Sequence, residues 1–151
     1  ENNISILLLG SGHEKTENAL TAIPQENFNT FIGYDEKLAH IMYAGADFLL
    51  MPSRVEPCGL NQMYSLRYGT VPIVNAIGGL KDTIIDITKE NGFGVVHHGV
   101  TVEKVTSAIA KASIYFNQKE FKTNLKKIMQ IDHSWGNSAQ AYLNLYKSLK
   151  N

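Results

Sequence analysis

Three shortages in this sequence limit the classes of protein it can encode. Cysteine occurs once, at Cys58, so an intrachain disulfide framework is excluded and a reducing, cytoplasmic compartment is expected. The longest apolar run, Ile4 to Leu9 around one serine, is too short to span a bilayer. Lysine plus arginine and aspartate plus glutamate number 14 each, so no surplus of positive charge indicates a nucleic acid or an anionic membrane as a partner.

Metal-binding patterns are also missing. The five histidines include no His-x-x-x-His or His-Glu-x-x-His arrangement that would place two imidazoles on one helix face. We therefore expect no metal, and we interpret the histidines as surface or loop residues: His13, His40, His97, His98 and His133.

The length and the first residues indicate one domain of a larger protein. A chain of 151 residues with 44% hydrophobic composition suits a single globular domain over residues 1–151. The sequence opens "ENNISILLLG", without an initiator methionine or a signal-like start, and enters a strand within four residues. We expect an upstream part of the protein to be missing.

Short apolar runs alternate with helical patterns, which is typical of a parallel sheet covered by crossover helices. The third strand is apolar on both faces and is predicted to be central in the sheet. The predicted strands span residues 4–10, 28–33, 47–52, 71–76 and 93–98, and the predicted helices between them span 14–23, 35–45, 59–69 and 78–84.

From Thr101 onward the pattern is helical. One apolar face is predicted along Val102, Val105, Ile109, Ala112 and Phe116, and a second along Phe121, Leu125 and Ile128. Asn117 and Glu120 resemble a capping box between them, Asp35 and Ser134 are predicted N-caps, and Gly69 is predicted to end a helix. We expect the apolar side of the last helix, with Tyr142 and Tyr146, to rest on the missing part and to be partly exposed here.

Two short motifs are weak candidates for function. Gly10-x-Gly12 follows a predicted strand like a dinucleotide fingerprint, but Lys15 stands at the third glycine position, so we interpret the motif as an ordinary strand-to-helix turn. Cys58 precedes a predicted helix, where a thiolate would be favoured, but no histidine is tied to it in sequence. A cysteine that lines a pocket is the preferred interpretation.

The loop "SRVEPCGLNQ" after the third strand carries the most information. In an open parallel sheet, ligands bind outside the carboxyl ends of the strands, where free N–H groups at a helix start can bind a phosphate. Gly59 lets the backbone approach that anion, and Glu56 suits hydroxyl groups on the same ligand. The loop predicts a site for a sugar attached to a phosphate, against the alternative of a capped helix with an exposed glutamate.

The stretch "PSRVEPCGLNQMYSLRYGTVPIV" with "GGLKDT" closely resembles the C-terminal domain of bacterial glycogen synthases and plant starch synthases. The likeness extends through "IGYDEKLAHIMYAGADFLLMPS" and "HSWGNSAQAYLNLY", which is nearly the whole chain. It implies the C-terminal half of a GT-B glycosyltransferase, in which two Rossmann-like domains face each other across a cleft. It also implies transfer of glucose from ADP-glucose, a substrate rather than a cofactor, to an α-1,4-glucan with retention.

The resemblance also implies roles for particular residues. Glu56 would contact the donor glucose in catalysis, and Tyr34 would stack on adenine, against the alternative of a core tyrosine. The remaining donor-binding residues would line the sugar pocket or present helix-start amides: Cys58, Gly59, Leu60, Asn61 and Gln62. Asn61 stands where many relatives have threonine, and Tyr64 where the wider group of retaining enzymes has a second glutamate.

Parts of the family's active site are absent from these residues. They are the arginine and lysine for the pyrophosphate, on the first strand-loop unit of the domain, and the glycine-rich loop and histidine of the N-terminal domain. We therefore expect this chain alone to transfer no glucose. Two alternatives remain open at this stage: a GT-B enzyme using a UDP-sugar, and a nucleotide-binding module without catalysis.

Overall fold

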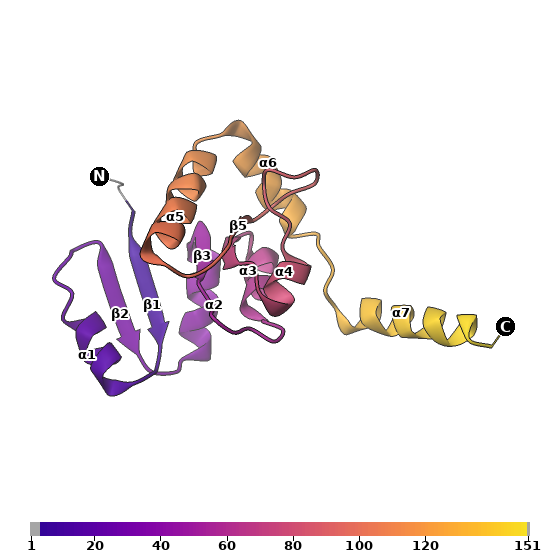
Figure 1. Ribbon diagram of the computed structural model, residues 1–151, viewed down its shortest axis with the longest axis horizontal. Coiled ribbons are helices and arrows are strands. Elements are labelled where there is room, and N and C mark those ends of the chain that lie inside the picture. Colours follow the sequence, from indigo (N-terminus) through magenta and orange to yellow (C-terminus); the bar gives the residue numbers. More distant parts are fainter. Residues whose placement is uncertain (1–3, 151) are drawn as a thin grey trace.

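The computed structural model describes residues 4–150, in which strands and helices alternate as predicted (Figure 1). Every predicted element is present, with ends that differ by a few residues at most. In chain order they are β1 (Ile6–Gly10), α1 (Glu14–Thr21), β2 (Phe28–Ile32), α2 (Glu36–Gly45), β3 (Phe48–Met51), α3 (Asn61–Tyr68), β4 (Val71–Asn75), α4 (Gly78–Thr83), β5 (Val95–His97), α5 (Val102–Phe116), α6 (Lys119–Ile128) and α7 (Trp135–Ser148).

The strands form two parallel sheets instead of the single sheet that we expected. One sheet pairs β1 with β2, and the other has the order β3-β4-β5. The prediction that the third strand is central was wrong, because among residues 4–150 it pairs only with β4 and Leu50 is 38% exposed. The central strand is β4, in which all five residues are buried.

The core lies on both faces of β4. Val71 and Val74 belong to a cluster with side chains from four helices: Leu66 of α3, Leu80 of α4, Tyr115 of α5 and Ile128 of α6. Burial on both faces explains why the sequence "VPIVN" is apolar without alternation. Asp35 and Gly69 have their predicted roles: the Asp35 carboxylate accepts from the Leu38 amide, and Gly69 ends α3 with φ of 82°.

The buried face of α5 differs from the prediction. It runs along Ala108, Ala112 and Tyr115, whereas Val102 is 78% exposed and Phe116 is 45% exposed. Ala108 and Ala112 pack with Val95 of β5, and their small side chains let the helix lie close to that strand.

The predicted capping box between α5 and α6 was wrong. The N-cap of α6 is Gln118, and its side chain makes no capping hydrogen bond. Asn117 instead lies at the C-terminal end of α5, where its side-chain amide donates to the Ser113 carbonyl. Ser134 does begin α7, but its own side chain makes no cap. The apolar residues Phe121 and Ile128 of α6 are buried as expected.

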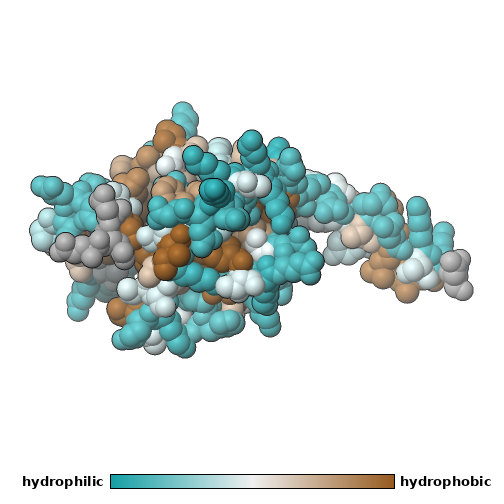
Figure 2. Space-filling view, turned by 90° about the horizontal axis from the view of Figure 1, so that it is seen from above, coloured by the Kyte–Doolittle hydropathy of each residue, from teal (hydrophilic) through white to brown (hydrophobic). Residues whose placement is uncertain are grey.

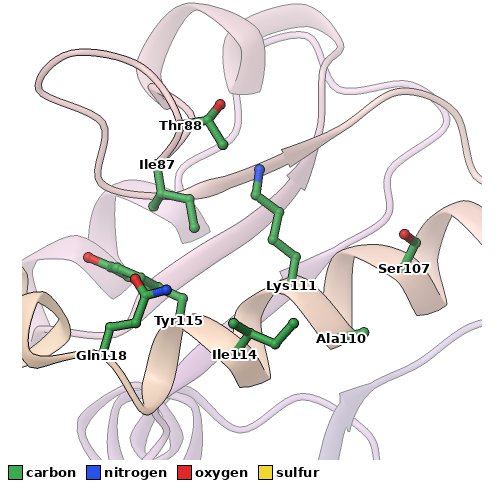
Figure 3. Close-up of a pocket in the computed structure, with 8 residues that line it drawn as sticks. All are labelled: Ile87, Thr88, Ser107, Ala110, Lys111, Ile114, Tyr115 and Gln118. Atoms are coloured by element: carbon green, nitrogen blue, oxygen red, sulfur yellow. The ribbon is translucent and has the colours of Figure 1, made fainter.

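A buried carboxylate joins the segment after α4 to the edge of β5 and to α5. Asp86 accepts from the amide of Val96 at 2.7 Å and from both the amide and the hydroxyl of Thr88, and it pairs with Lys111 at 2.8 Å. Figure 3 shows Lys111 reaching from α5 toward the segment of Ile87 and Thr88. Burial would raise the pKa of Asp86, but these hydrogen bonds outweigh burial and lower the pKa to about 2.

The loop between β3 and α3 lies directly against the first turn of α4. A Cβ added to Gly78 would lie 1.7 Å from the Glu56 carbonyl oxygen, and one added to Gly79 would lie 2.0 Å from that of Cys58. The Gly79 amide also donates to the Glu56 carbonyl at 3.3 Å. The two glycines therefore fix where the backbone of Glu56 to Cys58 lies.

The last helix extends away from the rest of the molecule (Figure 1), and every residue of α7 is exposed. Tyr142 is 59% and Tyr146 60% exposed, which confirms the expected exposure of this face. Figure 2 shows apolar side chains at the surface of this outlying helix. In the part of the chain that the structure describes, no helix has the length and apolar character needed to cross a membrane.

We predict that Lys111→Met lowers the free energy of unfolding at pH 7 by about 2 kcal/mol, because it removes the cation beside a buried carboxylate. The pKa of Asp86 in the folded chain, about 2, lies below its ordinary 3.8. Its stabilising contribution is therefore present above pH of about 4 and is lost as the pH falls toward about 2. Urea unfolding between pH 2 and pH 7 measures this, and the variant should show a smaller loss over that range.

The matched control is Lys122→Met on α6, where the lysine is exposed. Equal losses of stability in the two variants at pH 7 would contradict a stabilising role for the Asp86–Lys111 pair.

We predict that Gly79→Ala lowers the free energy of unfolding by about 1 to 3 kcal/mol, because its methyl group cannot fit against the Cys58 carbonyl without moving backbone. Gly45→Ala is the control, since no atom lies within 4 Å of the added Cβ in that helix, and it should be neutral or slightly stabilising. Chemical unfolding curves that coincide for the two variants would refute the close approach.

Candidate functional site

The candidate site lies at the carboxyl edge of the sheet β3-β4-β5. All three strands are parallel, so the segments that follow them emerge at the same edge. They are residues 52–60 after β3, 76–77 after β4 and 98–101 after β5. Ligands of open parallel sheets bind at such an edge.

Glu56 is partly buried in the first of these segments, and the Ser53 hydroxyl donates to its carboxylate at 3.3 Å. Four residues later, the N-cap of α3 is Leu60, whose apolar side chain makes no capping hydrogen bond. The first amides of α3 therefore have no side-chain acceptor among the described residues. A carboxylate held by a hydrogen bond thus stands four residues before the N-cap of a helix that lacks a side-chain cap.

The Gln62 side chain, to which the prediction gave no role, is fully buried. Its Nε2 donates to the carbonyls of Cys58 and Gly59 and to the Thr83 hydroxyl, at 3.0 to 3.2 Å. A Cβ on Gly59, where φ is +76°, would lie 2.5 Å from the Gln62 Oε1. The buried Gln62 side chain therefore joins the loop at Cys58 and Gly59 to Thr83 of α4 by hydrogen bonds.

The remaining predicted site residues are at the surface. Cys58, Leu60 and Asn61 are exposed on the loop and the first turn of α3. Tyr34 follows β2, in the other sheet, and is 88% exposed, which excludes the alternative of a core tyrosine. Its ring is free to stack on a flat ligand.

Three residues at this edge were missed or misjudged from sequence. Asn75 ends β4. Its side chain donates a hydrogen bond to the Ser53 carbonyl and accepts one from the Gly99 amide, each at 2.8 Å. His97 ends β5 with 7% exposure, so its interpretation as a surface or loop residue was wrong. Ser53 follows β3 and bonds Glu56. The signal that could have found all three was their place at or just after the ends of predicted strands.

Tyr64 lies in an aromatic cluster between α2 and α3. Its ring centroid is 6.2 Å from that of His40 and 6.3 Å from that of Tyr43. The Tyr68 hydroxyl forms a hydrogen bond with the His40 Nδ1 at 2.9 Å. Burial, and then the neighbouring Tyr64, raise the pKa of Tyr43. Tyr64, which is 44% exposed, is therefore a partly covered member of this aromatic cluster.

A hollow of about 450 Å³ lies elsewhere, between α5 and the segment after α4 (Figure 3). It is lined mainly by α5, including Lys111, Ile114 and Tyr115, and it contains none of the predicted site residues. Within residues 4–150, no group of histidine, cysteine and acidic side chains has the arrangement of a metal site.

Comparison with known proteins identifies relatives of this chain. Residues 1–128 match the sequence model of the family described as "Glycosyl transferases group 1". A glycogen synthase of Flavobacterium johnsoniae is 48% identical over 147 aligned positions, and the alignment covers 95% of this chain and 31% of that protein. A glycogen synthase of Fervidobacterium nodosum is 45% identical over 156 residues, covering 98% of this chain and 32% of that protein. The chain spans about a third of the length of these relatives.

Solved structures agree with the sequence relatives. The catalytic domain of starch synthase IV from Arabidopsis thaliana, bound to ADP and acarbose, superposes with a TM-score of 0.84 at 30% identity, over 95% of this chain and 32% of that one. Sucrose-phosphate synthase from Thermosynechococcus elongatus, at 22% identity and a TM-score of 0.68 over 95% of this chain and 38% of that one, shares the fold alone. The expected α/β fold of GT-B type and the resemblance to glycogen and starch synthases are confirmed. This chain therefore belongs to the group 1 glycosyl transferases, and its relatives there include glycogen and starch synthases.

Proposed function

We propose that this chain is the C-terminal, donor-binding domain of a cytoplasmic glycogen or starch synthase. The whole protein transfers glucose from ADP-glucose to the non-reducing end of an α-1,4-glucan and retains the anomeric configuration. The observation that carries the proposal is Glu56 held beside the uncapped start of α3, at the carboxyl edge of a parallel sheet. The names of the relatives and the ADP and acarbose bound to the starch synthase support this choice of substrates.

Each group at this edge has a role in the proposed reaction. As ADP departs, negative charge grows on its distal phosphate, and the N–H groups at the start of α3 stabilise it. The Glu56 carboxylate accepts a hydrogen bond from a sugar hydroxyl and balances the positive charge that develops on the glucose ring. Cys58 and Gly59 line the sugar pocket and Leu60 to Gln62 present amides, while Tyr34, which follows β2 of the other sheet, stacks on the adenine. This scheme uses no metal and no cofactor.

The proposal places further parts of the active site outside residues 4–150. The chain spans about a third of the length of its relatives, which leaves room for an N-terminal domain. Among the described residues, β1 pairs only with β2 and β3 only with β4, so each sheet has a free edge at these strands. We propose that the strand of the first strand-loop unit of the domain, which carries the arginine and lysine, pairs with these free edges of β1 and β3.

Removing the carboxylate tests the role of Glu56. Glu56→Ala in the full-length protein should lower kcat/KM for ADP-glucose by about 10- to 150-fold, the equivalent of a lost charge-assisted hydrogen bond of about 1.5 to 3 kcal/mol. Glu90→Ala is the matched control, because Glu90 is an exposed glutamate outside the site. Incorporation of labelled glucose into glycogen measures both variants. Near-normal activity of a correctly folded Glu56→Ala protein would refute the catalytic assignment.

The chain taken alone provides a second test. Because the proposed basic groups for the pyrophosphate lie outside it, we expect the 151-residue chain to bind ADP weakly and to form no glucan from ADP-glucose. Calorimetric titration with ADP and with UDP should show the tighter binding for ADP. Glucan synthesis by this chain alone would overturn the division of the site, and tighter binding of UDP would favour an enzyme that uses UDP-sugars.

A further inference from the structure

A series of hydrogen bonds runs along the carboxyl edge of the sheet and ends at Glu56. It is centred on Asn75, the last residue of β4, which is 7% exposed. The Asn75 Nδ2 donates to the Ser53 carbonyl at 2.8 Å, and its Oδ1 accepts from the Gly99 amide at 2.8 Å. One side chain thus joins the segment after β3 to the segment after β5.

Ser53 carries this connection to the carboxylate. Its carbonyl is held by Asn75, and its hydroxyl donates to the Glu56 Oε2 at 3.3 Å. The hydroxyl can reach Glu56 in this way only while the backbone at Ser53 keeps its place. The orientation of the carboxylate therefore depends on a residue of another strand.

His97 fixes the far end of the series. Its Nδ1 lies 2.9 Å from the Gly99 carbonyl, which can only accept, so Nδ1 carries the hydrogen. Gly99 has φ of +94°, a conformation that favours glycine, and its amide points to Asn75. The His97 Nε2 is buried and has no partner among the described residues. Gly99 is thus held by its neighbour on β5 and can in turn hold Asn75.

We propose that Asn75 is a positioning residue for Glu56 and that it acts through Ser53. The inference rests on the proposed function, in which Glu56 meets the donor sugar. A carboxylate that must match a transition state needs a fixed orientation, and displacement of a reacting group by about 1 Å can cost about 100-fold in rate. Asn75 supplies that orientation without touching the substrate.

The alternative is that Asn75 only stabilises the end of the sheet. A stabilising residue would change the unfolding temperature and leave the turnover of the folded enzyme unchanged. A positioning residue changes kcat, while KM for ADP-glucose stays nearly constant because the phosphate and adenine contacts remain. The two roles therefore give different kinetic results.

The test uses substitutions in the full-length protein at two points of the series. Ser53→Ala removes the hydroxyl, and Ser53→Thr restores one. Asn75→Asp keeps an acceptor for the Gly99 amide but sets an oxygen against the Ser53 carbonyl. We expect Ser53→Ala and Asn75→Asp each to lower kcat about tenfold, with KM for ADP-glucose changed by less than about threefold, and Ser53→Thr to recover most of the loss.

The double variant Ser53→Ala with Asn75→Asp shows whether the two residues act in series. If Asn75 acts through Ser53, the kcat of the double variant should lie within about twofold of the kcat of the slower single variant. The second substitution then breaks a connection that the first has already removed. Multiplied effects would mean that Asn75 acts independently of Ser53, and would overturn the proposal.

Asn124→Ala is the matched control. Asn124 is a second buried asparagine, also 7% exposed, and it lies on α6, outside the candidate site. Its side-chain amide donates to the Phe93 carbonyl at 3.1 Å. It should lower the unfolding temperature and leave kcat within about twofold. A tenfold loss of kcat in this control, or normal kcat in Ser53→Ala, would refute the positioning role.

Two precautions keep the outcomes separate. If Asn75→Asp does not fold, the comparison of Ser53→Ala with Ser53→Thr still decides whether the hydroxyl beside Glu56 matters to kcat, and equal kcat in the two overturns the proposal. Transfer of glucose from ADP-glucose by the unsubstituted protein is measured first. Its absence would refute the proposed function itself, whereas an active enzyme that tolerates Ser53→Ala would refute only the positioning role.

Discussion

The close approach of two backbones is the constraint on which the rest of the site depends. The carbonyls of Glu56 and Cys58 lie where the side chains of any other residues at 78 and 79 would have to be, so only glycine lets α4 start there. On its other side the loop is held by the buried Gln62 amide, which also reaches Thr83 of α4. A loop fixed from both sides can present a carboxylate and free helix-start amides without folding around the ligand, which reduces the ordering cost of binding.

Burial is unevenly distributed over the described chain. The sheet centred on β4 is covered on both faces, with residues such as Val71 and Val74 fully buried. By contrast, β1 and β2 form a separate pair of strands, and Leu7 is 60% exposed. The outlying α7 carries Tyr142 and Tyr146 with more than half of their surface exposed. In the proposed full-length protein, the remaining parts would pack on these free edges and apolar faces.

Much of the fold could be predicted because it depends on local pattern. Asp35 and Gly69 were assigned correctly, since a cap bond and a positive φ are properties of a few adjacent residues. The capping box at Asn117 was wrong because the chain uses that residue to close the preceding helix, and both roles suit the same side chain. The buried face of α5 differs from the predicted one because a close approach to β5 favours alanines over larger residues. His97 was misjudged because its burial depends on neighbouring segments that sequence spacing does not reveal.

By itself, the sequence determined the order of strands and helices, the loop in which Glu56 lies, and the family to which this loop and its surroundings are similar. These features depend on residue type and on spacing along the chain. Tertiary structure alone decided that the strands form two sheets, that the Gln62 side chain points inward, and that Ser53, Asn75 and Gly99 are bonded in series toward Glu56. The two contacts of Asn75, with Ser53 and with Gly99, join residues more than 20 positions apart along the chain, and only the packing of parallel strands brings such residues to one edge.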